Sequence, residues 1–283
     1  MGRVASRWFS RRYGPRTGRP VVLVPDAGRP AALWPDHLVA RLVGRGHRVV
    51  RLDLWDQGRS PRAEGPYGFD DLAAGLGEAL RTLGGRAPGL AAGEPLVVGF
   101  GLGGSLALEV AVSGSAPVGA VVAAGATGWY ADPGLPGPEE MVAVALVWRR
   151  READADPSEL VAALGREHRA LAAPASRPDA LAARAEAQRW VRWGFNPTDS
   201  HRAAWLAAPS RWDALGAVAG PVVVVHGTDD PWLPLAHGRR LAACVGPGGS
   251  PLVEVEGAGH VLDAPMCDAI VAAVGELGGR SAR

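Results

Sequence analysis

The stretch from residue 96 to residue 111 constrains the fold most, because a strand, a glycine-rich turn and a helix follow one another directly. An apolar strand pattern ends at the turn, and helical spacing of apolar residues begins at Leu102. Gly101 occupies the turn, with Gly99 and Gly103 on either side of it. Glycines at this spacing let the chain reverse sharply and let the helix pack closely on the strand. The stretch therefore predicts an α/β unit with a tight strand-to-helix turn.

Continuous apolar runs recur along the chain on both sides of this unit. Such runs are typical of strands that are buried on both faces, and helical patterns separate them. This alternation predicts a mostly parallel central sheet of about eight strands flanked by helices. The predicted strands lie at 20–24, 48–53, 96–100, 118–124, 222–225 and 252–255, with a first short strand expected at 8–13.

The strand pattern stops between residues 129 and 210. Helical patterns separated by proline-containing breaks take its place, at 139–150, 157–171, 178–193 and 199–207. We therefore expect an inserted helical cap over 129–210, and an α/β core formed by 1–128 and 211–283. Binding pockets favour aromatic walls, so we expect tryptophans of the cap to line one. The cap contains Trp129, Trp148, Trp190, Trp193 and Trp205.

Composition argues against several classes of partner. The formal net charge is +1, so no global field attracts nucleic acid or an anionic membrane. No apolar run approaches the roughly 20 residues of a membrane span, and the basic start of the chain lacks the apolar core of a signal peptide. Cys244 and Cys267 lie far apart without metal-ligand spacing, which favours free thiols in a reducing compartment. We expect a cytoplasmic monomer or homodimer that needs no metal and no cofactor.

An acid and a histidine follow the last two predicted strands. Asp230 comes after the run at 222–225, and His260 comes after the run at 252–255. With the turn at Gly101, these residues give the chain order nucleophile position, acid, base. The sequence therefore resembles the α/β-hydrolase fold superfamily over nearly its whole length. Two segments, 52–60 and 234–241, resemble its anthracycline methylesterase branch.

This resemblance implies roles for particular residues. Asp230 matches the acid and His260 the base, while the N–H groups of Leu102 and Ala27 match the two donors to an oxyanion. Two positions depart from the pattern, because Gly101 stands where serine is usual and Asp26 brings a carboxylate beside the oxyanion donors. Both departures disfavour ordinary ester hydrolysis. The residues expected to bind substrate are Leu102, Ala27, Gly101, Phe100, Asp26, Trp129 and Trp232.

Less specific interpretations exist for several of these residues. His260 could be a relic that only bonds to Asp230, and Asp26 could be a loop residue that bonds to nearby amides. Ser105 could act as a displaced nucleophile, although that register would place the sharp turn inside the helix.

A histidine base without a nucleophile suits proton abstraction next to a carbonyl. We therefore expect an isomerase, specifically an epimerase, acting on a modified peptide or polyketide intermediate of natural-product biosynthesis. The chain also resembles the nucleophile-less peptide epimerase of the bottromycin pathway, which is an analogy at the level of fold. One alternative is a lyase, a cyclase or a water-using, methylesterase-like hydrolase on a natural product. Another is an inactive protein that binds a small molecule.

Overall fold

The computed structural model describes residues 8–84, 94–140, 142, 156–197 and 200–280. Their strands form one seven-stranded sheet in the order β1-β3-β2-β4-β5-β6-β7, one strand fewer than the approximate number expected. All neighbouring strands are parallel except β1, which pairs antiparallel with β3 at the edge. The strands are β1 (Ser10–Tyr13), β2 (Pro20–Val24), β3 (Arg48–Leu52), β4 (Leu96–Phe100), β5 (Ala120–Ala124), β6 (Val222–Gly227) and β7 (Leu252–Val255).

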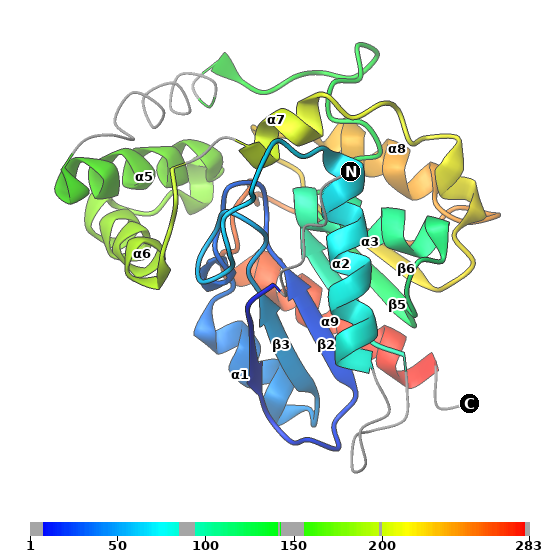
Figure 1. Cartoon of the computed structure of the whole chain (residues 1–283). Helices are drawn as coiled ribbons and strands as arrows, with labels where there is room; N and C mark the ends of the chain where they lie inside the picture. Colours follow the sequence, from blue (N-terminus) through cyan, green and yellow to red (C-terminus); the bar gives the residue numbers. More distant parts are fainter. Residues whose placement is uncertain (1–7, 85–93, 141, 143–155, 198–199, 281–283) are drawn as a thin grey trace.

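Helices cover both faces of this sheet (Figure 1). In β2, Val22 and Val24 point into one buried cluster, whereas Val21 and Leu23 point into the other. This alternation with both faces covered explains why the strands read as continuous apolar runs. Helices α1 (Asp36–Gly44) and α9 (Ala264–Arg280) cover one face, and α2 (Phe69–Gly84), α3 (Leu102–Ser113) and α8 (Leu235–Cys244) cover the other.

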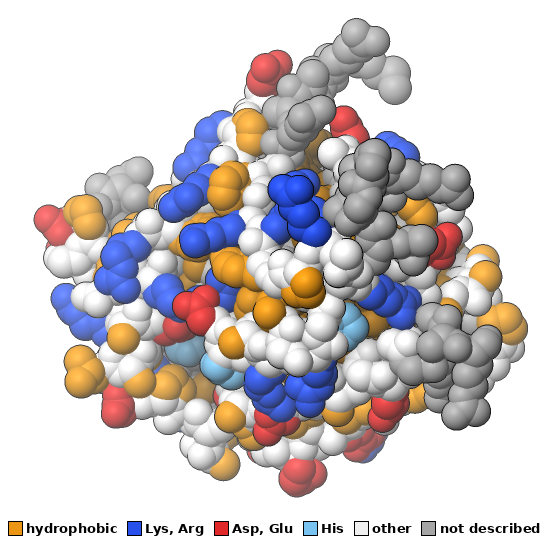
Figure 2. Space-filling view, turned by 90° about the horizontal axis from the view of Figure 1, so that it is seen from below, with side chains coloured by type: hydrophobic (Ala, Val, Ile, Leu, Met, Phe, Trp, Pro, Cys, Tyr) orange, Lys and Arg blue, Asp and Glu red, His pale blue; other side chains and the backbone are white. Residues whose placement is uncertain are grey.

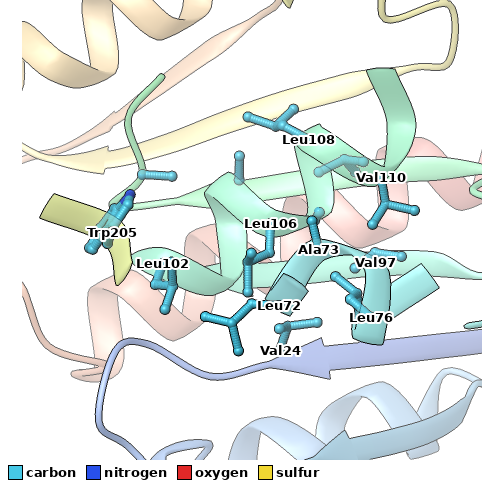
Figure 3. Close-up of a cluster of buried hydrophobic side chains, with 14 of the residues drawn as sticks. Val24, Leu72, Ala73, Leu76, Val97, Leu102, Leu106, Leu108, Val110 and Trp205 are labelled. Carbon is cyan, nitrogen blue, oxygen red and sulfur yellow. The ribbon is translucent and has the colours of Figure 1, made fainter. Parts of the chain in front are cut away.

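The core beside the glycine-rich turn joins α2, α3 and the sheet (Figure 3). Leucines at helical spacing on α2 meet leucines at helical spacing on α3, and valines of two strands lie beneath them. Burying one such side chain contributes about 1.5–3 kcal/mol, so this contact fixes the start of α3 against the sheet. The residues concerned are Leu72, Leu76, Leu102, Leu106, Val24 and Val97.

Between β5 and β6, the described residues contain the helices expected for the cap. These are α5 (Pro157–Leu171), α6 (Ala180–Trp193) and α7 (Ser200–Leu206), with short 3-10 turns at Pro174–Ser176 and Ala214–Ala217. Another 3-10 turn, Ala31–Leu33, precedes α1. Asp156 and Asp179 begin α5 and α6 by accepting backbone N–H groups at 2.7 Å. Most of the helix predicted at 139–150, including Trp148, lies outside the described residues.

The surface carries charges of both signs. Figure 2 shows arginine and acidic side chains interspersed across the face seen from below, with hydrophobic side chains between them. This distribution agrees with the formal net charge of +1. Within the described part of the chain, no helix combines the length and the apolarity needed to cross a membrane.

Candidate active site

The turn between β4 and α3 has the strained geometry that the glycines predict. Gly101 has φ 54° and ψ −120°, a conformation that L side chains rarely adopt, and it precedes the first residue of α3. A Cβ atom at Gly103 would overlap the carbonyl oxygen of Val24, so only glycine lets α3 approach β2 this closely. The turn therefore lies at the carboxyl end of β4, at the edge of the sheet where the central parallel strands end.

The carboxylate of Asp26 fills the space at this apex. Asp26 lies just after β2, and its Oδ1 accepts the backbone N–H of Leu102 at 2.8 Å. The N–H of Ala27 helps to lower the pKa of this carboxylate. A Cβ atom built on Gly101 would overlap Oδ1 of Asp26. The aspartate therefore occupies the volume that a side chain at position 101 would need, and it accepts the amide of Leu102, one of the two expected oxyanion donors.

Asp230 and His260 form a buried pair beside Asp26. Oδ1 of Asp230 accepts the N–H groups of Trp232 and Leu233 at 2.9 and 2.8 Å, which orients the carboxylate. Nδ1 of His260 lies 2.6 Å from Oδ2 of Asp230. The backbone N–H of His260 donates to the carbonyl of Leu171 at the end of α5, so the base is also tied to the inserted helices. This geometry brings the predicted acid and base together.

His260 lies between two carboxylates. Its Nε2 is 3.4 Å from Oδ2 of Asp26, and this buried atom has no hydrogen bond to the described residues. Burial of the ring opposes its charge, but Asp230 and Asp26 outweigh that cost and raise the pKa of His260 to about 10. Burial also opposes the charge of Asp26, yet His260 and the amides of Leu102 and Ala27 together lower its pKa. At neutral pH the site therefore holds an imidazolium between two carboxylates.

A cavity of about 460 Å³ opens onto this cluster. The side chain of Asp26 is 13% exposed whereas that of His260 is 1% exposed, so the carboxylate faces the space more fully. The ring of Phe100 lies 4.8 Å from that of His260, centroid to centroid. Core loops and the inserted helices both contribute apolar walls, including Leu33, Phe100, Leu171, Trp190, Val261 and Leu262.

Not every predicted substrate-binding residue lines this cavity. Phe100 and Asp26 do, whereas the ring of Trp232 lies 6.4 Å from that of His260 without lining the cavity. Trp129 lines a separate cavity of about 10 Å³, together with Ser105. The hydroxyl of Ser105 donates to the carbonyl of Thr127, which places it away from the base. Among the tryptophans expected in the cap, Trp190 alone lines the main cavity within the described chain.

Sequence reasoning missed a charged pair beside the cavity, of which Arg29 lines the wall. Arg29 bonds to Glu167 of α5 at 2.7 Å, with both side chains buried, and its guanidinium lies 4.4 Å from the ring centroid of Trp190. His168 packs edge-on against Trp190, and burial lowers its pKa to about 4. No sequence spacing connects these residues, because the packing of α5 and α6 on the core brings them together.

His201 of α7 was also missed, although it contacts the loop that carries Asp26. Its Nδ1 accepts the N–H of Gly28 at 3.1 Å, and its Nε2 lies 2.7 Å from the carbonyl of Trp55. Since Nδ1 is the acceptor, Nε2 carries the proton. A lone histidine in a helix has no motif that would have identified this contact.

The sheet order, the turn at Gly101 and the acid–histidine pair at the ends of β6 and β7 define a class of α/β protein with a hydrolase-type site. The chain belongs to the alpha/beta hydrolase family, whose sequence model matches residues 21–273. It is 30% identical to the Rhodomycin D methylesterase DnrP of Streptomyces peucetius, over 94% of this chain and 93% of that protein.

Solved structures show the same fold. An esterase of Exiguobacterium antarcticum matches with a TM-score of 0.76 and 18% identity, covering 96% of each chain. The enol-lactonase of Burkholderia xenovorans LB400 matches with a TM-score of 0.73 and 22% identity, covering 98% of each chain.

These names overturn the expectation of an isomerase. Methylesterases, esterases and lactonases are hydrolases, and a relative that is similar over 94% of this chain is a methylesterase. The epimerase prediction is therefore wrong. The hydrolase alternative agrees with the relatives.

Proposed function

We propose that this protein is a hydrolase that cleaves an ester of a small natural-product molecule. In this proposal Asp26, His260 and Asp230 perform the reaction in place of a serine-based triad. The observation that carries it is the Asp26 carboxylate at the turn of Gly101, 3.4 Å from the imidazole nitrogen that faces away from Asp230.

Each of these residues has a role in the proposed reaction. Asp230, held by two backbone amides, fixes the orientation and tautomer of His260. His260 moves a proton to and from the reacting groups, and Asp26 is the anionic group that meets the substrate. The amides of Leu102 and Ala27 stabilise negative charge beside Gly101.

The substrate class follows from the cavity and from the methylesterase relative. A volume of about 460 Å³ lies within the usual range for small-molecule sites and accommodates a polycyclic ligand. The cavity walls include the aromatic residues Phe100 and Trp190, together with charged residues such as Arg29 and Arg189. We therefore propose a methyl ester of a hydrophobic, ring-containing acid, in line with a relative that is named for the methyl ester of a natural product.

Turnover of methyl esters of polycyclic aromatic acids tests this proposal. The wild-type protein should release the free acid, and treatment with a fluorophosphonate should not abolish that activity. His260→Ala should lower the rate by about 10²–10⁴, the usual contribution of a general acid–base group. Leu181→Ala, at a side chain that is 77% exposed, serves as the control and should keep the wild-type rate. Absence of acid release from every ester would refute the proposed function.

A further inference from the structure

We propose that Asp26 is a covalent nucleophile that attacks the alkyl carbon of the ester, not its carbonyl carbon. This inference rests on the proposed ester hydrolase function and specifies which bond of the ester breaks. In it, the alkyl group passes from the substrate to Oδ2 of Asp26 and then to water. Asp26 reaches the site from the loop after β2 and not from the turn after β4, and glycine at position 101 leaves the space that its carboxylate occupies.

The first observation is the relative access to Asp26 and His260. The side chain of Asp26 is 13% exposed and that of His260 is 1% exposed, so the carboxylate is more accessible from the cavity than the imidazole. Oδ1 is held by the amide of Leu102, which leaves Oδ2 as the oxygen that faces His260. A carboxylate that is ionised, oriented and exposed to the cavity has the properties of a nucleophile.

The second observation is that one of the expected oxyanion donors is already occupied. Attack on a substrate carbonyl would create an oxyanion that needs such donors, but the amide of Leu102 donates to Asp26 itself. A substrate oxyanion would also develop next to an existing negative charge, which opposes it. Displacement at the alkyl carbon creates no tetrahedral oxyanion, so it suits this arrangement.

The amide of Leu102 also serves the second step, in which the Asp26 ester is hydrolysed. Once Oδ2 carries the alkyl group, Oδ1 is the carbonyl oxygen of an Asp26 ester and still lies against the amide of Leu102. Water activated by His260 can then attack Cγ of Asp26, and the charge that develops on Oδ1 is stabilised where it forms. The site is therefore organised for hydrolysis of its own esterified side chain.

The two steps balance. In the first, Oδ2 of Asp26 forms a bond to the methyl carbon and the bond from that carbon to the substrate oxygen breaks, so the substrate leaves as a carboxylate. Alkylation removes the charge of Asp26 and lowers the pKa of His260, which releases its proton to water and can then act as a base. In the second, His260 takes a proton from water, hydroxide adds to Cγ and methanol leaves. Asp26 becomes a carboxylate again and His260 becomes an imidazolium again.

A single turnover in water labelled with heavy oxygen distinguishes this route from direct attack by water. The protein is held in excess over methyl naphthoate, and the released naphthoic acid and the peptide containing Asp26 are analysed by mass spectrometry. The proposal predicts heavy oxygen in Asp26 and none in the naphthoic acid. The buried carboxylates Asp53 and Asp230, together with a sample lacking ester, provide unlabelled controls.

The alternative outcomes separate the two proposals. Heavy oxygen in the naphthoic acid with an unlabelled Asp26 would overturn the nucleophile assignment and leave the hydrolase function intact. No naphthoic acid at all, with this and related methyl esters, would overturn both. As a second test, His260→Gln should retain a methyl group on Asp26, because water is no longer activated; an unmodified Asp26 in a variant that still consumes ester would contradict the proposal.

Discussion

At the residue scale, positions 26 and 101 share one volume. A side chain on Gly101 and the carboxylate of Asp26 cannot both occupy the apex of the turn, because an added Cβ would overlap Oδ1. The two positions must therefore be considered together: glycine at 101 provides the space in which the aspartate reaches the base.

This shared volume predicts the behaviour of Gly101→Ser. The substitution should destabilise the fold, because the positive φ alone costs about 1–3 kcal/mol and the overlap with Asp26 adds to it. It should confer no labelling by fluorophosphonates. Combining it with Asp26→Gly frees the space and should place the introduced hydroxyl beside His260, so the double variant should be labelled. Labelling and thermal unfolding of the single and double variants measure both effects.

Two results would contradict this view of the turn. One is strong labelling of Gly101→Ser with Asp26 intact, and the other is labelling of the wild type at Ser105. Gly101→Ala is the matched control for strain without a hydroxyl, and it should lose as much stability as Gly101→Ser.

The buried ion pairs of His260 predict how stability depends on pH. Its pKa is about 10 in the folded protein, against a reference of 6.5. Because the pKa of His260 is raised in the folded protein, its protonated form stabilises the fold. This stabilisation is fully present below about pH 6.5 and is lost as the pH rises through about 10. The free energy of unfolding in urea should therefore fall across this interval, and fall less steeply in His260→Gln. Equal slopes in the two proteins would contradict the pairing.

The sequence predicted part of this site for a clear physical reason. Asp230 and His260 follow buried strands, and parallel strands bring their carboxyl ends to one edge of the sheet, so their proximity was predictable. Asp26 was identified as a carboxylate beside the oxyanion donors. That it fills the place of a side chain at Gly101 depends on the path of a loop, which no periodicity encodes.

At the scale of elements, the inserted helices hold the loops of the site. Trp193 at the end of α6 donates to Asp53 at 3.0 Å, and Gln57 exchanges hydrogen bonds with the backbone of Asn196. His201 of α7 joins Gly28 to Trp55. These contacts tie the loops after β2 and β3 to the segment between β5 and β6.

Removing the link made by α7 should affect both stability and catalysis. His201→Ala leaves the buried N–H of Gly28 and the carbonyl of Trp55 without this partner, at a cost of about 1–3 kcal/mol for each group. The loop of Asp26 should loosen, so the rate constant kcat should fall more than KM rises. Leu206→Ala, on the same helix at a side chain that is 43% exposed, is the control. Unchanged kcat in a destabilised His201→Ala would show that the contact is structural only.

The elements themselves were largely predictable, but their packing was not. The predicted helix at 157–171 matches α5 because Asp156 and Pro157 mark its start. The predicted division into a core and a cap of 129–210 remains a prediction. The positions of α5 and α6 over the cavity, which place Glu167 and Trp190 beside Arg29, follow from tertiary contacts that helical spacing does not specify.

At the scale of the whole molecule, the fold was predictable because most central strands are apolar runs, as a sheet with helices on both faces requires. The buried strand β3 differs, since it contains Arg48 and Arg51. The function was harder to predict, because the candidate site combines side chains from separate loops. The predicted isomerase was replaced by a hydrolase because the relatives are named as methylesterases and esterases. In the proposed function a carboxylate meets the substrate, which would let a hydrolase fold act with glycine at its turn.

The most direct test of this account is methanol release from methyl esters of polycyclic aromatic acids by the wild type and by Asp26→Asn. The asparagine keeps the size of the side chain and an oxygen for the amide of Leu102, so the fold should persist. The account predicts turnover by the wild type that resists fluorophosphonate, and a loss on the order of 10³-fold in Asp26→Asn. Equal rates in the two proteins, or no methanol from the wild type, would contradict it.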